Sequence, residues 1–365
     1  FKNERNSLVM TKKIAVGMSG GVDSSVAAAL LKNQGYDVFG IMLRLWSEPG
    51  QSTNGQNRCC SPESITRARQ VAAMLDIPFY VLDAKNVFHE SVVSFFIDKY
   101  SSGVTPNPCL ECNKNIRWGH LLEKSLAMGA SHLATGHYAR VDKRGDKWFL
   151  LRGSDQNKDQ SYALSMIGQK ELKHTLFPIG KYTKNKIRDL AKQFDLPVAE
   201  RQESQDLCFL ADRNYRRFMH QYAPKSMKPG PITNSKGEKI GDHKGLPLYT
   251  IGQRKGIGIS AKEPLYVLEK NMSTNTLIVD KHSKLGKNHL SVNKVNWISG
   301  DPIHKNFRAK VQLRYTARAI SAWILPKNDK ELNIKLDKPI NDITPGQAAV
   351  FYQNDSCLGG GIIIT

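Results

Sequence analysis

The chain has 365 residues, more than the roughly 250–300 at which a single hydrophobic core stops growing, so we expect two or three domains. Its 53 Lys and Arg against 33 Asp and Glu give a net charge of +20, which favours a polyanionic partner unless the basic bias is shared by the whole proteome. No apolar run approaches the ~18 residues of a membrane-spanning helix, and the first nine residues hold no apolar signal core.

Short β-branched runs alternate with helical patterns over the first part of the chain. The predicted strands are residues 12–18, 38–45, 78–84 and 132–138, and the predicted helices are 23–35, 61–76, 86–100 and 115–129. The second helix opens with Ser61 as N-cap and Pro62 at its first position. This alternation predicts an α/β class with a doubly wound parallel sheet, where ligands bind at the carboxyl ends of the strands.

The pattern changes twice further along. Residues 139–153 predict a hairpin that turns at Arg144–Gly145 and decorates the α/β domain, and residues 183–195 predict another helix. A basic helical piece at 213–223 leads into a region rich in Pro, Gly and Lys, and only short strands follow from about residue 286, typical of a small β-barrel. We therefore predict domains at 10–210, 211–285 and 286–365, with Met10 as the natural start.

The segment "VGMSGGVDSS", Val16 to Ser25, has the composition of a phosphate-binding loop between a strand and a helix. Its glycines let backbone N–H groups close around an anion, and the hydroxyls of Ser19, Ser24 and Ser25 add donors. It lacks the lysine with which a Walker A loop reaches the β- and γ-phosphates. Such a loop suits a reaction that releases intact pyrophosphate and transfers AMP. Asp23 is a candidate to orient the loop or to place Mg²⁺.

The six cysteines are Cys59, Cys60, Cys109, Cys112, Cys208 and Cys357. Without a secretory signal, we interpret them as reduced thiols with catalytic or metal-binding roles, not as a disulfide framework. This interpretation favours a cytoplasmic protein of bacterial type, with an organellar matrix as the alternative.

Several stretches together resemble one family. They are "GMSGGVDSS", "TPNPCLECNK", "ATGHYAR", "NKDQSYALS", "LFPIGKYTK", "ESQDLCFL", "LYTIGQRKGIGI", "EPLYVLEK", "LRYTARA" and "TPGQAAVFY". In this order they are similar to the tRNA-specific 2-thiouridylases, within the N-type ATP pyrophosphatases that carry a PP-loop. The resemblance implies adenylation of O2 of the wobble uridine with ATP and Mg²⁺, followed by displacement of AMP by sulfur. Implied ATP contacts are Gly17, Met18, Ser19, Gly20, Gly21, Val22, Asp23, Ser24, Leu43 and Gly136.

The resemblance also implies the sulfur chemistry and the RNA contacts. Cys208 matches the thiol that carries a persulfide, and Cys112 matches the nucleophile that releases the product and leaves a disulfide. Nearby Lys114, Arg117 and a helix start after Asn113 are expected to lower the pKa of Cys112. Implied partners are the tRNA anticodon loop and a sulfur-donor protein, and the enzyme is expected to be a monomer. Implied RNA contacts are Asn107, Pro108, Cys109, His137, Lys158, Asp159, Gln160, Arg314, Tyr315 and Gln347, with Gln253, Arg254 and Lys255 as further phosphate contacts.

Cys109 departs from the family pattern, in which many members have aspartate. Together with Cys112 and Cys208 it supplies three thiolates, enough to hold a [4Fe–4S] cluster with one iron left open for sulfide. Transfer of a cluster-bound sulfide therefore stays open beside the persulfide route. Two other functions also stay open: another AMP-forming PP-loop ligase, and a non-enzymatic RNA-binding metalloprotein with a structural C-x-x-C. Cys59, Cys60 and Cys357 are expected to be non-catalytic.

Overall fold

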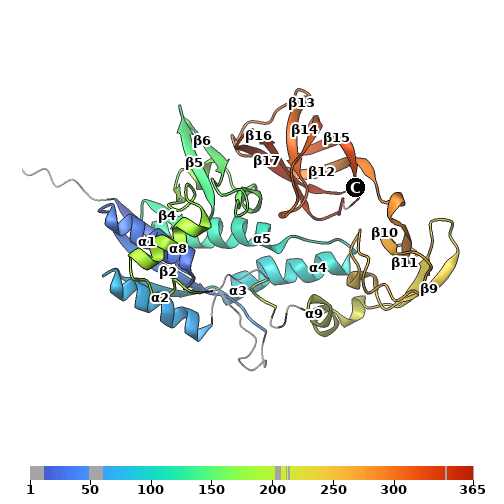
Figure 1. Ribbon diagram of the computed structural model, residues 1–365, viewed down its shortest axis with the longest axis horizontal. Helices are drawn as coiled ribbons and strands as arrows, with labels where there is room; N and C mark the ends of the chain where they lie inside the picture. Colours follow the sequence, from blue (N-terminus) through green and yellow to red (C-terminus); the bar gives the residue numbers. More distant parts are fainter. Residues whose placement is uncertain are drawn as a thin grey trace, which may run out of the picture.

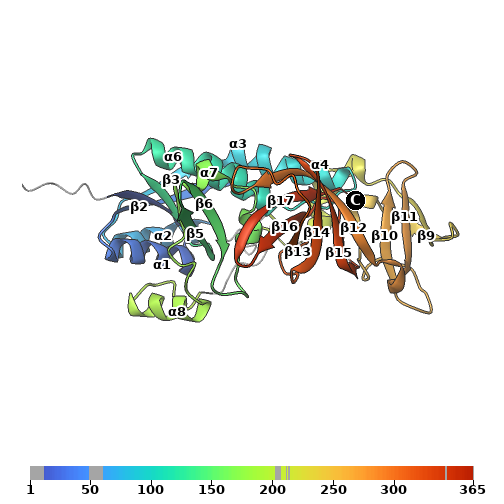
Figure 2. The same cartoon turned by 90° about the horizontal axis from the view of Figure 1, so that it is seen from above.

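The structure, a computed structural model, describes residues 12–48, 61–201, 207–210, 212, 214–341 and 343–364, so Met10, Cys59 and Cys60 lie outside it. Three parts follow one another along the longest axis: a parallel α/β part, a β-barrel and a small mixed sheet at the far end (Figures 1 and 2). Of the helices that the structure describes, none is long and apolar enough to cross a membrane.

The first part is built on a five-stranded parallel sheet in the order β3-β2-β1-β4-β7. Its strands are β1 (Lys13–Gly17), β2 (Asp37–Arg44), β3 (Phe79–Asp83), β4 (His132–Thr135) and β7 (Thr175–Leu176). The chain winds outward in opposite directions from β1, through β2 and through β4. The predicted doubly wound sheet is thus confirmed, and its switch point lies between β1 and β4.

Both faces of this sheet are buried, and neighbouring residues of one strand face opposite sides. Ile14 and Val16 pack into one core, whereas Ala15 packs into the other. Three helices supply residues to the first core: α1 (Val22–Asn33), α2 (Pro62–Met74) and α8 (Lys184–Gln193). The predicted cap of α2 is confirmed, because the Ser61 hydroxyl accepts a hydrogen bond from Ser64 N at 3.2 Å.

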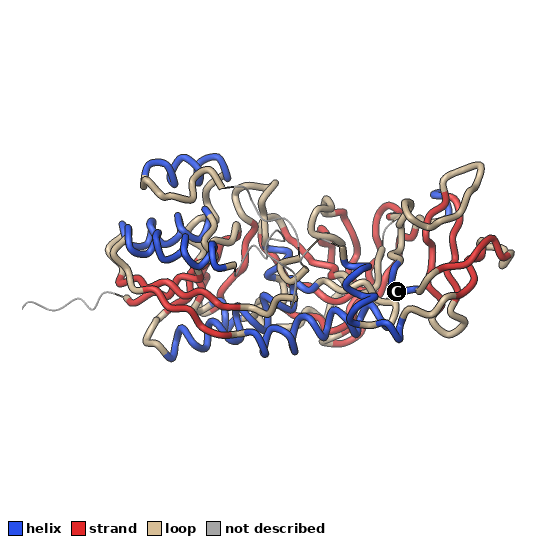
Figure 3. The backbone as a smooth tube through the Cα atoms, turned by 90° about the horizontal axis from the view of Figure 1, so that it is seen from below, coloured by secondary structure: helices blue, strands red, loops and turns tan. Residues whose placement is uncertain are grey.

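Two long helical runs extend from the sheet toward the far end of the molecule (Figure 3). The first joins α3 (Lys85–Phe88), the π-helical η1 (His89–Ser94) and α4 (Phe95–Ser101). The second joins α5 (Pro108–Glu111), the π-helical η2 (Cys112–Leu121) and α6 (Leu122–Ala127). It starts at its N-cap Asn107, so the predicted helix start after Asn113 is wrong and Cys112 lies inside the helix.

The hairpin joins β5 (Ala139–Arg144) to β6 (Lys147–Arg152), and Arg144 pairs with Lys147. The turn is therefore Gly145–Asp146, one residue later than predicted. The hairpin also does more than decorate the α/β domain, because β6 pairs with β17 of the barrel. Short elements η3 (Ser161–Leu164) and α7 (Gln169–Leu172) follow before β7.

The small sheet at the far end has the order β10-β11-β8-β9. Its core includes Val267, Leu277 and Val279, which lie in strands that were not predicted from the sequence. The elements of this part are α9 (Tyr215–Tyr222), η4 (Pro224–Ser226), β8 (Gly230–Thr233), β9 (Lys239–His243), η5 (Leu246–Leu248), β10 (Leu265–Asn271), β11 (Thr276–Lys281) and η6 (His282–Lys284).

The predicted barrel is confirmed as six antiparallel strands closed by the pairing of β12 with β17. Alternating apolar residues of β15, Leu332, Ile334 and Leu336, fill its interior. The strands are β12 (Lys287–Trp297), β13 (Phe307–Gln312), β14 (Ile320–Asn328), β15 (Glu331–Ile340), β16 (Ala348–Gln353) and β17 (Ser356–Ile363).

Candidate active site

The phosphate loop leaves β1 at Gly17 and enters α1 through the N-cap Gly21. Met18 is buried and its backbone N donates to Ile41 O of β2 at 2.8 Å, which fixes the start of the loop. Gly20 turns the chain with a φ of +68°, a conformation that favours glycine. The loop thus presents backbone N–H groups and the positive end of a 12-residue helix at the switch point of the sheet.

Serine hydroxyls hold this loop closed. Ser24 Oγ accepts from Ser19 N at 3.2 Å and lies 3.3 Å from the Ser19 hydroxyl. Ser24 and Ser25 both donate to Gly21 O, at 3.2 and 2.9 Å. These bonds preorganise the loop. Ser25 is buried, and its hydroxyl stabilises the first turn of α1 by its bond to Gly21 O.

The loop after β4 lies directly against the start of α1. A Cβ on Gly136 would lie 2.6 Å from Ser24 N and 2.7 Å from the carbonyl carbon of Asp23, so a larger residue would displace the phosphate loop. Leu43, near the end of β2, is half-buried. The ATP contacts implied by the sequence therefore gather at the carboxyl ends of β1, β2 and β4.

A buried ammonium group reaches this loop from α8. Lys184 Nζ and the Tyr138 hydroxyl both donate to Asp23 Oδ1 at 2.7 Å, and Lys184 is 7% exposed. Lys184 directly follows Thr183, whose side chain caps α8. Lys184 was not predicted as a site residue from the sequence. The available signal was its position as the first residue of a helix that Thr183 caps. The single Asp23 carboxylate fits a Mg²⁺ ion held mainly by substrate phosphates.

His137 follows Gly136, and its half-buried ring packs against Trp118 and Phe177. Its Nδ1 lies 2.8 Å from the Thr135 hydroxyl. Burial, and secondarily the positive charge of Arg117, lower the pKa of His137 to about 3. The ring is therefore neutral at pH 7 and suits a positioning role better than proton transfer.

The two cysteines of the C-x-x-C sequence occupy different surroundings. Asn107 Oδ1 accepts from Cys109 N at 3.2 Å, which places Cys109 in the first helical turn. The Cys109 side chain is exposed there. Cys112 is half-buried one turn later, and it packs against an apolar cluster that includes Phe88 and Phe209. Cys208, also half-buried, packs against the same cluster. The two implied sulfur-handling residues thus border one core.

Cys357, in contrast, is buried in β17, and burial raises the pKa of its thiol to about 12. The expectation that it is non-catalytic agrees with this inert environment. Within the described ranges, no three or more His, Cys, Asp or Glu side chains form a group that could hold a metal ion. Cys109, Cys112 and Cys208 are all described, and they form no such group.

The barrel holds the segment that precedes Cys109. Gln347 Nε2 donates to Thr105 O at 3.1 Å and to Pro106 O at 3.2 Å, and Thr105 N donates to Pro345 O at 3.0 Å. Gly346 has a φ of +93°, and a Cβ there would lie 2.7 Å from Thr105 O. Gln347 therefore positions the loop that leads to Asn107 and the buried Pro108.

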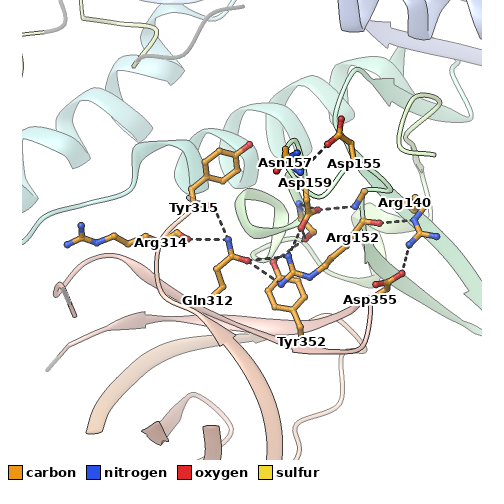
Figure 4. Close-up of polar contacts among 12 residues, drawn as sticks. Arg140, Arg152, Asp155, Asn157, Asp159, Gln312, Arg314, Tyr315, Tyr352 and Asp355 are labelled. Carbon is orange, nitrogen blue, oxygen red and sulfur yellow. Dashed lines mark hydrogen bonds and ion pairs between the residues drawn. The ribbon is translucent and has the colours of Figure 1, made fainter. Parts of the chain in front are cut away.

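A second contact between the barrel and the α/β part centres on Arg152 (Figure 4). Its guanidinium lies 3.5 Å from the centre of the Tyr352 ring and donates to Asp159 Oδ2 at 2.7 Å and to Gln312 Oε1 at 3.3 Å. Asp159 also accepts from Gly153 N and from Ser161, and its side chain is 5% exposed. Asp159 thus shapes its own loop.

Gln312 links Arg152 to the backbone of Arg314 and Tyr315, two of the implied RNA contacts in the barrel. Its Nε2 donates to Tyr315 O at 2.8 Å and to Arg314 O at 3.2 Å. The Tyr315 ring is 44% exposed, and its edge-to-face partner is the buried Tyr162 at 6.2 Å. The Asn107 side chain lies close enough to Tyr162 to lower the pKa of its hydroxyl, against the larger effect of burial, which raises it. Asn107 and Tyr315 therefore meet at the same tyrosine.

The remaining implied RNA contacts lie nearby or at the far end. Lys158 is half-buried, and Gln160 is tied to the α/β part because its Oε1 accepts from Tyr138 N at 2.9 Å. Arg254 and Lys255 are exposed in the loop between η5 and β10, at the far end of the molecule. Gln253 Nε2 donates to Lys255 O at 2.9 Å, which orders that turn.

Comparisons with known proteins cover nearly the whole chain. A tRNA methyl transferase HUP domain matches residues 12–212, a tRNA methyl transferase PRC-barrel domain matches 216–281, and an aminomethyltransferase beta-barrel domain matches 287–363. The tRNA-specific 2-thiouridylase MnmA of Clostridium perfringens is 42% identical over 96% of this chain and 98% of its own. This chain belongs to the tRNA-specific 2-thiouridylase family.

Two further 2-thiouridylases are similarly related. The MnmA of Natranaerobius thermophilus is 41% identical over 98% of both chains, and MnmA 1 of Caldanaerobacter subterraneus is 43% identical over 97% of this chain and 98% of its own. A solved 4-thiouridine synthetase in complex with RNA and ATP covers 59% of this chain and 51% of its own at 15% identity, with a TM-score of 0.34. The family membership rests on the 2-thiouridylases.

Proposed function

We propose that this protein thiolates the wobble uridine of tRNA to 2-thiouridine at the expense of ATP, which is cleaved to AMP and pyrophosphate. The observation that carries the proposal is the placement of a phosphate loop without a Walker lysine at the switch point of the sheet. Relatives named tRNA-specific 2-thiouridylase, related over almost their full length, support the same reaction.

The phosphate loop activates the base. Uridine O2 attacks the α-phosphorus of ATP, a bond forms between them, and pyrophosphate leaves with the electron pair of the broken P–O bond. Backbone donors of Gly20 and Gly21 and the α1 dipole stabilise the negative charge. When bound at Asp23, Mg²⁺ neutralises phosphate charge. Leu43 and Gly136 are the proposed neighbours of the adenosine.

The cysteines deliver the sulfur. The terminal sulfur of a Cys208 persulfide attacks C2 of the uridine, and AMP leaves. The Cys112 thiolate then attacks Cys208 Sγ, which breaks the sulfur–sulfur bond, releases 2-thiouridine and leaves a Cys112–Cys208 disulfide. The shared apolar cluster beside both residues supports this pairing. A sulfur-donor protein must renew the persulfide, and a reductant must open the disulfide.

The anticodon loop is the proposed substrate, because a base can be unstacked there and presented to the phosphate loop. Asn107, Cys109 and the exposed ring of Tyr315 are proposed to contact the displaced base or its neighbours. Arg314 and Lys158, together with Arg254 and Lys255 in the loop between η5 and β10, are proposed to contact phosphates. The net charge of +20 agrees with such a partner.

The test measures pyrophosphate release and nucleoside products with purified protein, tRNA and a persulfide donor. We expect one AMP and one pyrophosphate for each 2-thiouridine formed. Cys112→Ser and Cys208→Ser should abolish 2-thiouridine, whereas Cys357→Ser, at a buried and inert position, should keep it. Formation of ADP, or of 2-thiouridine in the Cys208 variant, would rule out the proposed chemistry.

A further inference from the structure

The first turn of α2 packs directly against the phosphate loop. At Gly20 the backbone comes so close to the Ser64 carbonyl that a Cβ would clash with it. Ser64 is fully buried, and it lies three residues after the N-cap Ser61. Side chains from the first turns of α2 therefore belong to the surroundings of the phosphate site.

Two guanidinium groups converge on the hydroxyl of Ser64 from different elements. Arg67, on α2, donates from Nη2 at 3.0 Å, and Arg201, in the chain after α8, donates from Nη2 at 3.4 Å. Ser61 Oγ donates to the same oxygen at 3.2 Å. A hydroxyl oxygen has two acceptor lone pairs, so three donors exceed what Ser64 can accept. Arg201 Nη1 also donates to Gly20 O, in the phosphate loop itself.

Arg67 has donor capacity to spare. Its Nε is shielded from solvent and bonds to nothing in the described part of the chain. The neighbouring acid, Glu63, forms no ion pair with it, and the pKa of Glu63 is lowered mainly by the Ser61 hydroxyl and least by the charge of Arg67. Shielded charged donors are normally bonded, so this one calls for an anion.

We propose that Arg67 and Arg201 bind the β- and γ-phosphates of ATP and hold the pyrophosphate as it leaves. The planar guanidinium matches phosphate oxygens and keeps its charge at all working pH values. The loop has no Walker lysine, and the ammonium of Lys184 is already bonded to Asp23. The inference rests on the proposed function only in that the nucleotide is ATP.

These residues act at a defined point of the adenylation. The bond between uridine O2 and the α-phosphorus forms while the bond from that phosphorus to the bridging oxygen breaks. The electron pair goes to the pyrophosphate, and the proton on N3 of the uracil passes to solvent. Because the negative charge grows on the leaving group, cations placed beside it favour the transition state over bound ATP.

The test is a binding comparison without tRNA. Affinities for ATP, inorganic pyrophosphate and AMP, each with Mg²⁺, are measured by calorimetry on wild type, Arg67→Gln, Arg201→Gln and Arg67→Lys. The matched control is Arg69→Gln, an exposed arginine two residues along the same helix. We expect a loss of about tenfold or more for ATP and pyrophosphate in both glutamine variants, based on one charge-assisted hydrogen bond. AMP should stay within about twofold, and Arg67→Lys should fall between.

Unchanged affinity for ATP and pyrophosphate in both glutamine variants would overturn the inference. An equal loss for AMP would also overturn it, because that result indicates distortion of the whole site. If Arg67→Gln does not fold, Arg67→Lys and Arg201→Gln decide the question. A wild type that binds ATP but releases no pyrophosphate with tRNA would instead refute the proposed function. The binding comparison would still decide whether Arg67 and Arg201 contact the phosphates of ATP.

Discussion

Replacement of Lys184 by methionine removes an ammonium group that hydrogen-bonds to Asp23, at 2.7 Å. Breaking a fully buried pair costs about 3–5 kcal/mol, because the remaining charge is left without compensation. The Asp23 side chain is 31% exposed, so water replaces part of the lost interaction and we expect about 2 kcal/mol. For a domain of about 200 residues, this corresponds to a fall of about 4–8 °C in Tm.

Nucleotide binding should report the same change. In the absence of Mg²⁺, the Asp23 carboxylate that has lost its ammonium partner repels the triphosphate, and we expect about tenfold weaker ATP binding, or about 1.4 kcal/mol. Lys186→Met, at an exposed position of the same helix, is the matched control and should leave both values unchanged. The double variant Asp23→Asn, Lys184→Met should recover part of the Tm, as expected for a direct pair. A Tm within about 1 °C of wild type together with unchanged ATP affinity would refute the reasoning.

Three further outcomes are expected. Gln347→Leu leaves the carbonyls of Thr105 and Pro106 without their donor, so the thiolation rate should fall about tenfold while ATP affinity stays constant, with the exposed Gln353→Leu as control. Asp159→Asn leaves Arg152 without its carboxylate partner and should lower the free energy of unfolding by about 3 kcal/mol, measured as a lower Tm. An unchanged Tm would contradict a stabilising role for this buried ion pair. The pKa of His137 lies near 3 in the folded protein, so the unfolded chain takes up this proton first and stability falls as the pH drops from about 6.5. Between pH 7 and pH 5, His137→Gln should therefore lose less free energy of unfolding than wild type, by up to about 2 kcal/mol, which appears as a smaller fall in Tm.

Local sequence signals predicted the parts of the site that neighbouring residues determine. The glycine turn at Gly20 and the Ser61–Pro62 start of α2 both depend on backbone preferences within a few positions, and both occur in the structure. The helix that carries Cys112 was placed too late. Its first turn is capped by Asn107 and begins with Pro108, a start signal hidden inside a segment interpreted as a base-binding loop.

The long-range contacts had no local signal. Lys184 bonds to a residue 161 positions away, and Gln347 to one 242 positions away. The pairing of β6 with β17 likewise follows from the docking of the barrel, which no periodicity in residues 139–153 encodes. Sequence patterns therefore indicated which segments are the proposed contacts of ATP and tRNA, whereas the side chains that hold those segments in place emerged only from the assembled fold.

The most direct test of the central claim is a single turnover of sulfur. Anaerobically purified protein is loaded with a ³⁵S-labelled persulfide, freed of the donor, and mixed with ATP and tRNA, and its iron content is measured on the same sample. The account predicts label in 2-thiouridine, close to one per protein, from a sample without stoichiometric iron, and loss of the label in Cys208→Ser. Thiolation that requires stoichiometric iron, and that disappears with it in Cys109→Ala, would contradict the account.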